Sequence, residues 1–388
     1  LSLISSGFFF YLWAKKELKN SFPAFMGAVL YLFTPYHLVD LHFRVALGET
    51  VFFACLPLFF YCFAKFKEEK NLLWILITSI NFSLLLFAHQ AMTIFSLLII
   101  APYILFSGLT TKNKQQFFLS SIAILVLGFC YAAYSWYPHI LYPPYTLAYQ
   151  LTNSTVVFPS LQELLYSPWR YGFLFQGSKG ELSYLIGYTQ IFILLLCIFL
   201  LLTKKAKEVM KPLTLWMILA IFLIFMMTQS ASFIWNSLPL LNTAQFASRL
   251  LLVLTFAIAT IAAYLTIRFK KYPYVLSIFL VITIGYTLLN WGHRKVIPEI
   301  TEEKIIQNLP YSTIQGEGFC CMGEPKWTLS TTRWKNEIPS QHLKIIQGKG
   351  QIKEFKRKST QHTYIVHSEA GIKVEEFTWY FPGWEAYI

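Results

Sequence analysis

Charged residues are scarce in this chain. They make up 13% of its 388 residues, against 56% hydrophobic ones, whereas a soluble domain usually carries nearly twice that charge. The composition therefore excludes an ordinary soluble domain and indicates an integral membrane protein. The net charge of +13 does not indicate nucleic-acid binding, because most of the lysines lie in short loops between apolar runs, where they set membrane topology.

Several motifs of well-known enzyme classes are also missing. The chain has no Walker loop, no dinucleotide-binding glycine motif, no nucleophile elbow and no zinc-spaced set of Cys and His. No Asp, Glu, Lys or Arg lies in the middle of an apolar run. Because a proton- or sodium-coupled transporter usually needs an acid at mid-membrane, this absence argues against such a transporter.

What the chain has in abundance is long apolar runs. Several are shorter than the ~20 residues of an ideal span, and tilt or aromatic flanks would cover the difference. We therefore expect an all-α polytopic membrane protein, with a transmembrane domain over 1–291. The ten runs that predict its helices are 1–13, 22–36, 50–64, 72–88, 91–108, 117–137, 186–203, 213–229, 247–267 and 274–291.

Basic residues alternate along the junctions between these runs. One set of junctions holds fifteen Lys and Arg and the other set, up to residue 291, holds four. This bias assigns the basic set to the cytoplasm and the loops 37–49, 138–185 and 230–246 to the outside. The tail, 292–388, mixes charges with scattered aromatics and falls outside by the same alternation.

The tail carries three segments with the pattern of strands, namely His342–Gln347, Thr363–His367 and Gly371–Tyr380. We expect a small β-rich extracytoplasmic domain that is truncated before its end. Because the chain begins inside an apolar run, we also expect it to be a fragment at its N-terminal end.

The segment Pro35–Glu49 gathers ionisable groups between two apolar runs. It contains Asp40, the only aspartate of the chain, together with His42, Arg44 and Glu49. Acids at the outer membrane face can take a proton from an acceptor hydroxyl or hold a metal, so we name Asp40, Glu49 and His42 as catalytic candidates. The alternatives stay open: Asp40 and Arg44 can be a pair that orders the loop, and His42 an interfacial residue without a catalytic task.

Cations at the same face can neutralise a phosphate leaving group. Arg44, Arg170 and Arg249 are the candidates, and Gln245 would share a helix face with Arg249 about one turn away. The alternative for Arg249 is an arginine that extends to lipid headgroups.

Two further segments contain candidate substrate-binding residues. His89 and Gln90 mark a tight outer turn, which can also be a simple turn or a helix cap. Trp169 and Arg170 lie among many aromatics in the long outer loop, where rings can stack on sugars or prenyl chains or rest in the interface.

These segments together resemble the multi-pass bacterial proteins labelled "6-pyruvoyl-tetrahydropterin synthase-related", and the resemblance covers about 20–290. The tail motif Tyr380–Trp384 is similar to one in the outer β-domains of related membrane proteins. The segments that carry the resemblance are Tyr31–Glu49, Ala88–Gln90, Ser167–Gly172, Leu238–Leu241, Gln245-Phe246 and Arg249.

The family resembles the GT-C superfamily of membrane glycosyltransferases. This resemblance implies a GT-C-like fold, a location in the bacterial inner membrane, and transfer of a sugar from a polyprenyl-phosphate donor to an envelope glycan, lipid or protein. It also implies that the principal acid follows the first membrane helix, a region that we expect to precede Leu1, so that Asp40 would serve the acceptor side. The sequence assigns no metal ligands and leaves a divalent metal open.

Two rival functions remain from the sequence alone. A flippase or other transporter of lipid-linked sugars would move its substrate without forming a glycosidic bond. A non-catalytic assembly protein would bind envelope polymers and tolerate loss of charge at Asp40 and Arg249.

Overall fold

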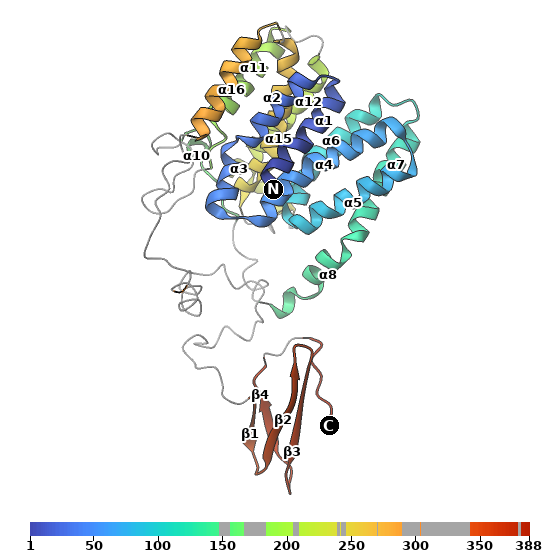
Figure 1. Cartoon of the computed structure of the whole chain (residues 1–388), viewed down its shortest axis with the longest axis vertical. Coiled ribbons are helices and arrows are strands. Elements are labelled where there is room, and N and C mark those ends of the chain that lie inside the picture. The colour runs from blue at the N-terminus through green and yellow to red at the C-terminus, as the bar shows by residue number, and fades with distance from the viewer. Residues whose placement is uncertain are drawn as a thin grey trace. The chain divides into compact units, whose positions relative to one another are not determined.

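The structure is a computed structural model, and it describes residues 1–146, 156–166, 184–204, 209–238, 241, 246–269, 271–288, 303, 342–378 and 382–388. The described chain is mostly helical and ends in a small β region (Figure 1). It divides into two compact units, 1–138 with 154–295, and 139–153 with 296–388. The coarse prediction of a helical membrane protein with a β-rich tail is confirmed in this form.

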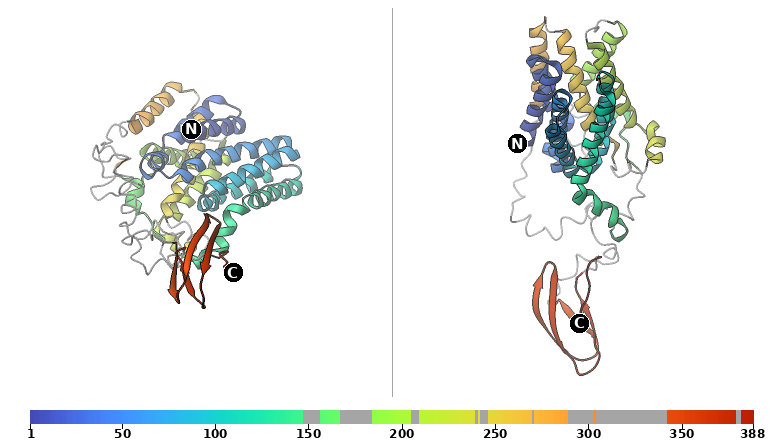
Figure 2. Two further views of the ribbon diagram at one scale, coloured as in Figure 1. Left: turned by 60° about the horizontal axis from the view of Figure 1, so that its bottom comes forward. Right: turned by 90° about the vertical axis from the view of Figure 1, so that its right-hand side faces the viewer.

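The helices of the first unit follow the predicted apolar runs closely. Its long helices run side by side, as the right-hand view of Figure 2 shows. They are α1 (Ser2–Leu18), α2 (Ser21–Leu32), α4 (Leu47–Glu69), α5 (Leu72–Ala88), α6 (Gln90–Leu109), α7 (Lys114–Tyr131), α11 (Tyr188–Leu202), α12 (Met210–Met226), α15 (Leu250–Arg268) and α16 (Pro273–Leu288).

Short helical segments connect or extend these helices. They are α3 (Pro35–Val39), the π-helical turn η1 (Asp40–Arg44), α8 (Ala133–Leu141), η2 (Pro143–Tyr145), α10 (Leu161–Leu165), η4 (Gln229–Ala231), α13 (Ser232–Ser237) and η5 (Ala247–Arg249).

By length and composition, four helical stretches in the described part of the chain could cross a membrane. They are 47–69, 90–109, 114–131 and 247–268. Up to six could do so if each of two bent helix pairs is one span, and three shorter apolar helices accompany them. The described helices therefore support a multi-pass membrane protein, with fewer candidate spans than the ten predicted runs.

Helix α15 forms the centre of this unit. It is apolar on all sides, and 94% of its most apolar window is buried, as expected of a helix surrounded by other helices. Small residues let α2 approach it, because a Cβ atom added at Gly27 would lie 2.9 Å from the Ala263 Cβ and 3.0 Å from the Ala259 carbonyl oxygen. Aromatic rings fill the space around α15. The ring centres of Phe256, on α15, and Phe60, on α4, lie 4.6 Å apart.

Cap residues fix where several helices begin. The side chains of Asn20, Asn71 and Asn113 accept hydrogen bonds from backbone amides in the first turns of α2, α5 and α7. An Asx side chain at this position satisfies an amide that has no partner within the helix. The basic junctions between the apolar runs thus also carry helix-start signals.

The described part of the tail contains two antiparallel strand pairs. Strand β1 (Leu343–Gln347) pairs with β4 (Lys373–Glu376), and β2 (Gln351–Lys358) pairs with β3 (Gln361–His367). Three of these strands overlap the predicted ones, whereas β2 was missed because its charged residues hide the alternation of a strand. Glu376 accepts hydrogen bonds from Arg357 and Tyr364 at 2.9 Å each, which ties β4 to the other pair.

Candidate functional site

The segment 37–49, expected as an outer loop, is largely helical. Pro35 occupies the first turn of α3, where its missing amide hydrogen is not needed. The chain then continues into the π-helical turn η1 and leaves it at Val45, which has a φ of 49°. π-Helical turns are rare and are often found at functional sites. This turn brings Asp40 and Arg44, four residues apart, onto one side.

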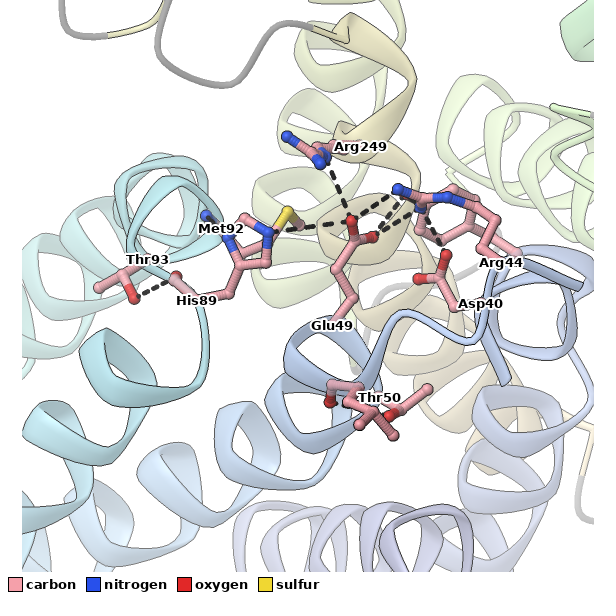
Figure 3. Close-up of polar contacts among 10 residues, drawn as sticks. Asp40, Arg44, Glu49, Thr50, His89, Met92, Thr93 and Arg249 are labelled. Carbon is pink, nitrogen blue, oxygen red and sulfur yellow. Dashed lines mark hydrogen bonds and ion pairs between the residues drawn. The ribbon is translucent and has the colours of Figure 1, made fainter. Parts of the chain in front are cut away.

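Arg44 binds two carboxylates at once (Figure 3). Its Nη1 donates to Asp40 Oδ1 at 2.6 Å and to Glu49 Oε2 at 3.0 Å, while its Nη2 donates to Glu49 Oε1 at 2.9 Å. The bidentate contact to Glu49 matches the planar fork of a guanidinium group. The sequence left open a loop-ordering pair of Asp40 and Arg44, and in the structure Glu49 binds Arg44 as well.

Glu49, in the first turn of α4, is the hub of the cluster. Its Oε1 accepts a hydrogen bond of 3.1 Å from Nε of Arg249, which lies 200 residues further along the chain. Its Oε2 accepts one of 2.8 Å from the Tyr36 hydroxyl. His89 Nε2 lies 3.9 Å from Oε1, and Figure 3 shows His89 to the left of the Glu49 carboxylate, Arg249 above it and Arg44 to its right.

Burial differs sharply between the acids and the cations of this cluster. The side chains of Asp40 and Glu49 are 0% and 1% exposed, whereas those of Arg44, Arg249 and His89 are 20%, 17% and 23% exposed. Two carboxylates balance two guanidinium groups, which makes burial of the acids tolerable. The accessible side of the cluster is therefore its cationic side.

Arg249 is held by its own local structure. It ends the 3-10 turn η5 directly before α15, and its guanidinium group lies 5.5 Å from the ring centre of Phe246. The backbone of this segment is anchored to another part of the chain, because Ala247 N donates to the Val157 carbonyl oxygen at 3.0 Å. The arginine therefore sits at the N-terminal end of the central helix.

His89 caps helix α6 and faces Glu49. Its Nδ1 accepts from the Met92 amide at 3.4 Å, so the neutral ring carries its hydrogen on Nε2, toward Glu49. Burial lowers the pKa of His89, and Arg249 and Arg44 lower it further, against the opposing effect of Glu49. This direction favours the neutral ring, which offers an N–H donor. Gly48 permits this approach, because a Cβ added there would lie 2.6 Å from the Ala88 carbonyl oxygen.

The structure thus brings together Asp40, Arg44, Glu49, His89 and Arg249 of the predicted site residues. Gln90 points elsewhere, since its Nε2 donates to the backbone oxygen and the hydroxyl of Ser135. His42 lies in η1 and is half-buried. Three predicted residues lie outside the described part of the chain: Trp169, Arg170 and Gln245.

Sequence reasoning missed Tyr36 as a member of the site. Its hydroxyl accepts from Arg44 Nη1 at 2.9 Å and donates to Glu49 Oε2, and its ring centre lies 5.9 Å from the Arg44 guanidinium carbon. A signal was present, because Tyr36 precedes Asp40 by four residues, in the short helix that leads into η1. Its apolar ring made it look like a packing residue.

The described residues do not make a metal centre. Among them, no three His, Cys, Asp or Glu side chains gather where they could hold a metal ion. Both carboxylates of the cluster are engaged by arginine, although Asp40 Oδ2 is buried without a hydrogen-bond partner in the described structure. What the cluster can do is bind an anion on its accessible side, with two guanidinium groups and one neutral N–H donor.

Comparisons with known proteins agree with this membrane architecture. Neither the curated proteins nor the solved structures contain a match to the chain. A family model does match it, over residues 1–293. The chain belongs to that family, the 6-pyruvoyl-tetrahydropterin synthase related domain, a family of membrane proteins.

Proposed function

We propose that this protein is an integral-membrane glycosyltransferase that transfers a sugar from a polyprenyl-phosphate donor to a cell-envelope acceptor. The observation that carries the proposal is the pair Arg44 and Arg249. Arg44 ends the turn before α4 and Arg249 ends the turn before α15, and both converge on one buried carboxylate, Glu49. Charges held in this way are expected where a substrate charge must be stabilised.

The roles of the residues follow from their burial. Arg249 and Arg44 bind the donor phosphate, and the Nε2 hydrogen of His89 adds a third contact. Asp40 and Glu49 orient the two arginines before the donor arrives. Because the two acids already hold the arginines in place, their side chains lose little conformational entropy when the donor binds.

The transfer step then uses the same groups. The oxygen of an acceptor hydroxyl attacks the anomeric carbon, and the bond from that carbon to the phosphate oxygen breaks with inversion. The arginines stabilise the departing polyprenyl phosphate. Because the phosphate competes with Glu49 for Arg249 and Arg44, donor binding loosens the ion pairs of Glu49. That carboxylate can then accept the hydroxyl proton.

The same proposal includes the topology and the cellular location. We infer ten membrane spans of a GT-C-like fold in a bacterial inner membrane, with the cluster and the tail from residue 292 outside. The alternation of basic and basic-poor junctions supports this arrangement. Accessibility of single introduced cysteines to a membrane-impermeant thiol reagent would test it, with Lys112 and Thr146 as positions expected on opposite sides.

The deciding experiment replaces Arg249 with Met, which keeps an unbranched side chain and removes the charge. We expect transfer of sugar from a labelled polyprenyl-phosphate sugar to an envelope fraction to be lost. Membrane insertion and detergent extraction should be unchanged. Arg268→Met, at the other end of α15, is the matched control and should retain transfer.

Three results would count against the proposal. Unchanged turnover in Arg249→Met would remove the arginine from the mechanism. Movement of a lipid-linked sugar across vesicles without a new glycosidic bond would indicate a flippase instead. Full function in both Arg249→Met and Asp40→Asn would indicate a non-catalytic assembly protein.

A further inference from the structure

A second feature of the helical unit is an apolar groove of about 350 Å³ between α2, α11, α15 and α16. Met26, Leu196, Leu265 and Leu276 are among its lining residues, one from each helix. The lining is almost wholly apolar, because the hydroxyl of Thr266 is turned onto the Ala262 carbonyl oxygen at 2.8 Å. A groove of this kind suits a hydrocarbon chain and not a polar solute.

The groove lies toward the end of α15 that is far from the Glu49 cluster. Its lining includes Leu265, Phe269 and Tyr272, and so reaches the turn between α15 and α16. Leu265 follows Arg249 by sixteen residues, which corresponds to about 24 Å along a helix. The groove is therefore separate from the candidate site.

Basic residues flank the same ends of the groove-forming helices. Lys19 precedes α2, Arg268 ends α15 and Lys271 precedes α16, and all three are exposed. Lys and Arg close to the membrane surface attract anionic headgroups. The groove and these residues together are complementary to an amphiphile, that is, a molecule with an anionic headgroup and a hydrocarbon chain.

We propose that this groove binds an acyl chain of an anionic glycerophospholipid, whose headgroup is contacted by Lys19, Arg268 and Lys271. The lipid comes from the leaflet at the basic end of the helices. Its chain packs between α11 and α16 and fills a space that protein side chains leave open. The proposal is independent of the proposed sugar transfer, since it involves neither Arg44 nor Arg249.

Photo-crosslinking of the full chain in lipid nanodiscs tests the groove. The probes are phosphatidylglycerol and phosphatidylcholine of equal chain length, each with a diazirine in one acyl chain. Leu196→Trp fills the groove. Leu195→Trp is its matched control, because Leu195 is the preceding residue on α11, is 60% exposed and does not line the groove.

We expect phosphatidylglycerol to label peptides from α11 and α16 several-fold more than phosphatidylcholine does. Leu196→Trp should reduce this labelling several-fold and Leu195→Trp should not. Equal labelling by the two lipids, or equal loss in both variants, would show bulk lipid only and overturn the proposal.

The headgroup contacts need a separate test, which does not alter the packed interior. Arg268→Gln combined with Lys271→Gln should lower phosphatidylglycerol labelling to the phosphatidylcholine level, and Lys112→Gln combined with Lys114→Gln should leave it unchanged. Retained preference for phosphatidylglycerol in the first double variant would exclude these residues as the headgroup site.

Discussion

Glu49 holds together the cluster at the N-terminal end of α4. Three residues, Tyr36, Arg44 and Arg249, donate hydrogen bonds to its carboxylate, whereas the Asp40 carboxylate accepts from Arg44. Removing Glu49 leaves two partly buried cations without this counter-charge, which typically costs about 3–5 kcal/mol. Glu49→Gln should therefore lower the melting temperature in detergent clearly more than Asp40→Asn, whose loss we expect to be about 1–3 kcal/mol. A larger loss in Asp40→Asn would contradict the hub assignment.

His89 gives a prediction for the dependence of stability on pH. Its pKa is lowered in the folded protein, chiefly by burial, so the unfolded chain binds more protons at this residue below about pH 6.5. Because the folded protein binds fewer protons at His89 than the unfolded chain does, its free energy of unfolding decreases as the pH falls below that value. His89→Asn keeps a capping side chain but cannot be protonated. The variant should lose less thermal stability than the parent protein between pH 7.5 and 5.5, and parallel curves would refute this.

The contact between α2 and α15 depends on one small residue. A Cβ atom at Gly27 would meet Phe10, Ala263 and the Ala259 carbonyl oxygen within about 3 Å, whereas nothing lies within 4 Å of a Cβ at Gly285 in α16. Gly27→Ala should therefore destabilise the protein by about 1–3 kcal/mol. Gly285→Ala should be neutral or stabilising by up to ~1 kcal/mol. Thermal unfolding of both variants in the same detergent provides the comparison, and equal shifts would argue against close packing at Gly27.

Two polar clusters lie toward opposite ends of α4 in the helical unit. In the second cluster, Lys67 donates to Glu17 at 3.3 Å and to the Tyr103 hydroxyl at 3.1 Å. Lys67 follows Glu49 by eighteen residues, or about 27 Å along a helix. At this separation the losses from Glu17→Gln and Glu49→Gln should add within about 0.5 kcal/mol. Under the proposed function, only Glu49→Gln should alter binding of the polyprenyl-phosphate donor. A strong non-additive term in the free energy of unfolding would show that the two clusters are coupled.

Much of the helical unit could be predicted because a continuous apolar run in the sequence indicates a membrane helix. The run 72–88 coincides with α5, and 247–267 lies within η5 and α15. The π-helical turn at Asp40–Arg44 could not be predicted in this way, since three of its five residues are polar and its geometry depends on the packing of α3 and α4. Strand β2 was missed for a related reason, because charges outnumber apolar residues along it.

The sequence by itself determined that this is a membrane protein, where most helices lie, and that Asp40, Arg44 and Glu49 share one segment, because apolar runs and local spacing are properties of the chain. Only the tertiary structure decided that Arg249 and His89 join Glu49, that Tyr36 belongs to the cluster and that Gln90 does not. Contacts between residues 200 apart depend on how helices pack. The same packing buried the acids and left the cations accessible, and it is this arrangement that we propose binds an anionic substrate.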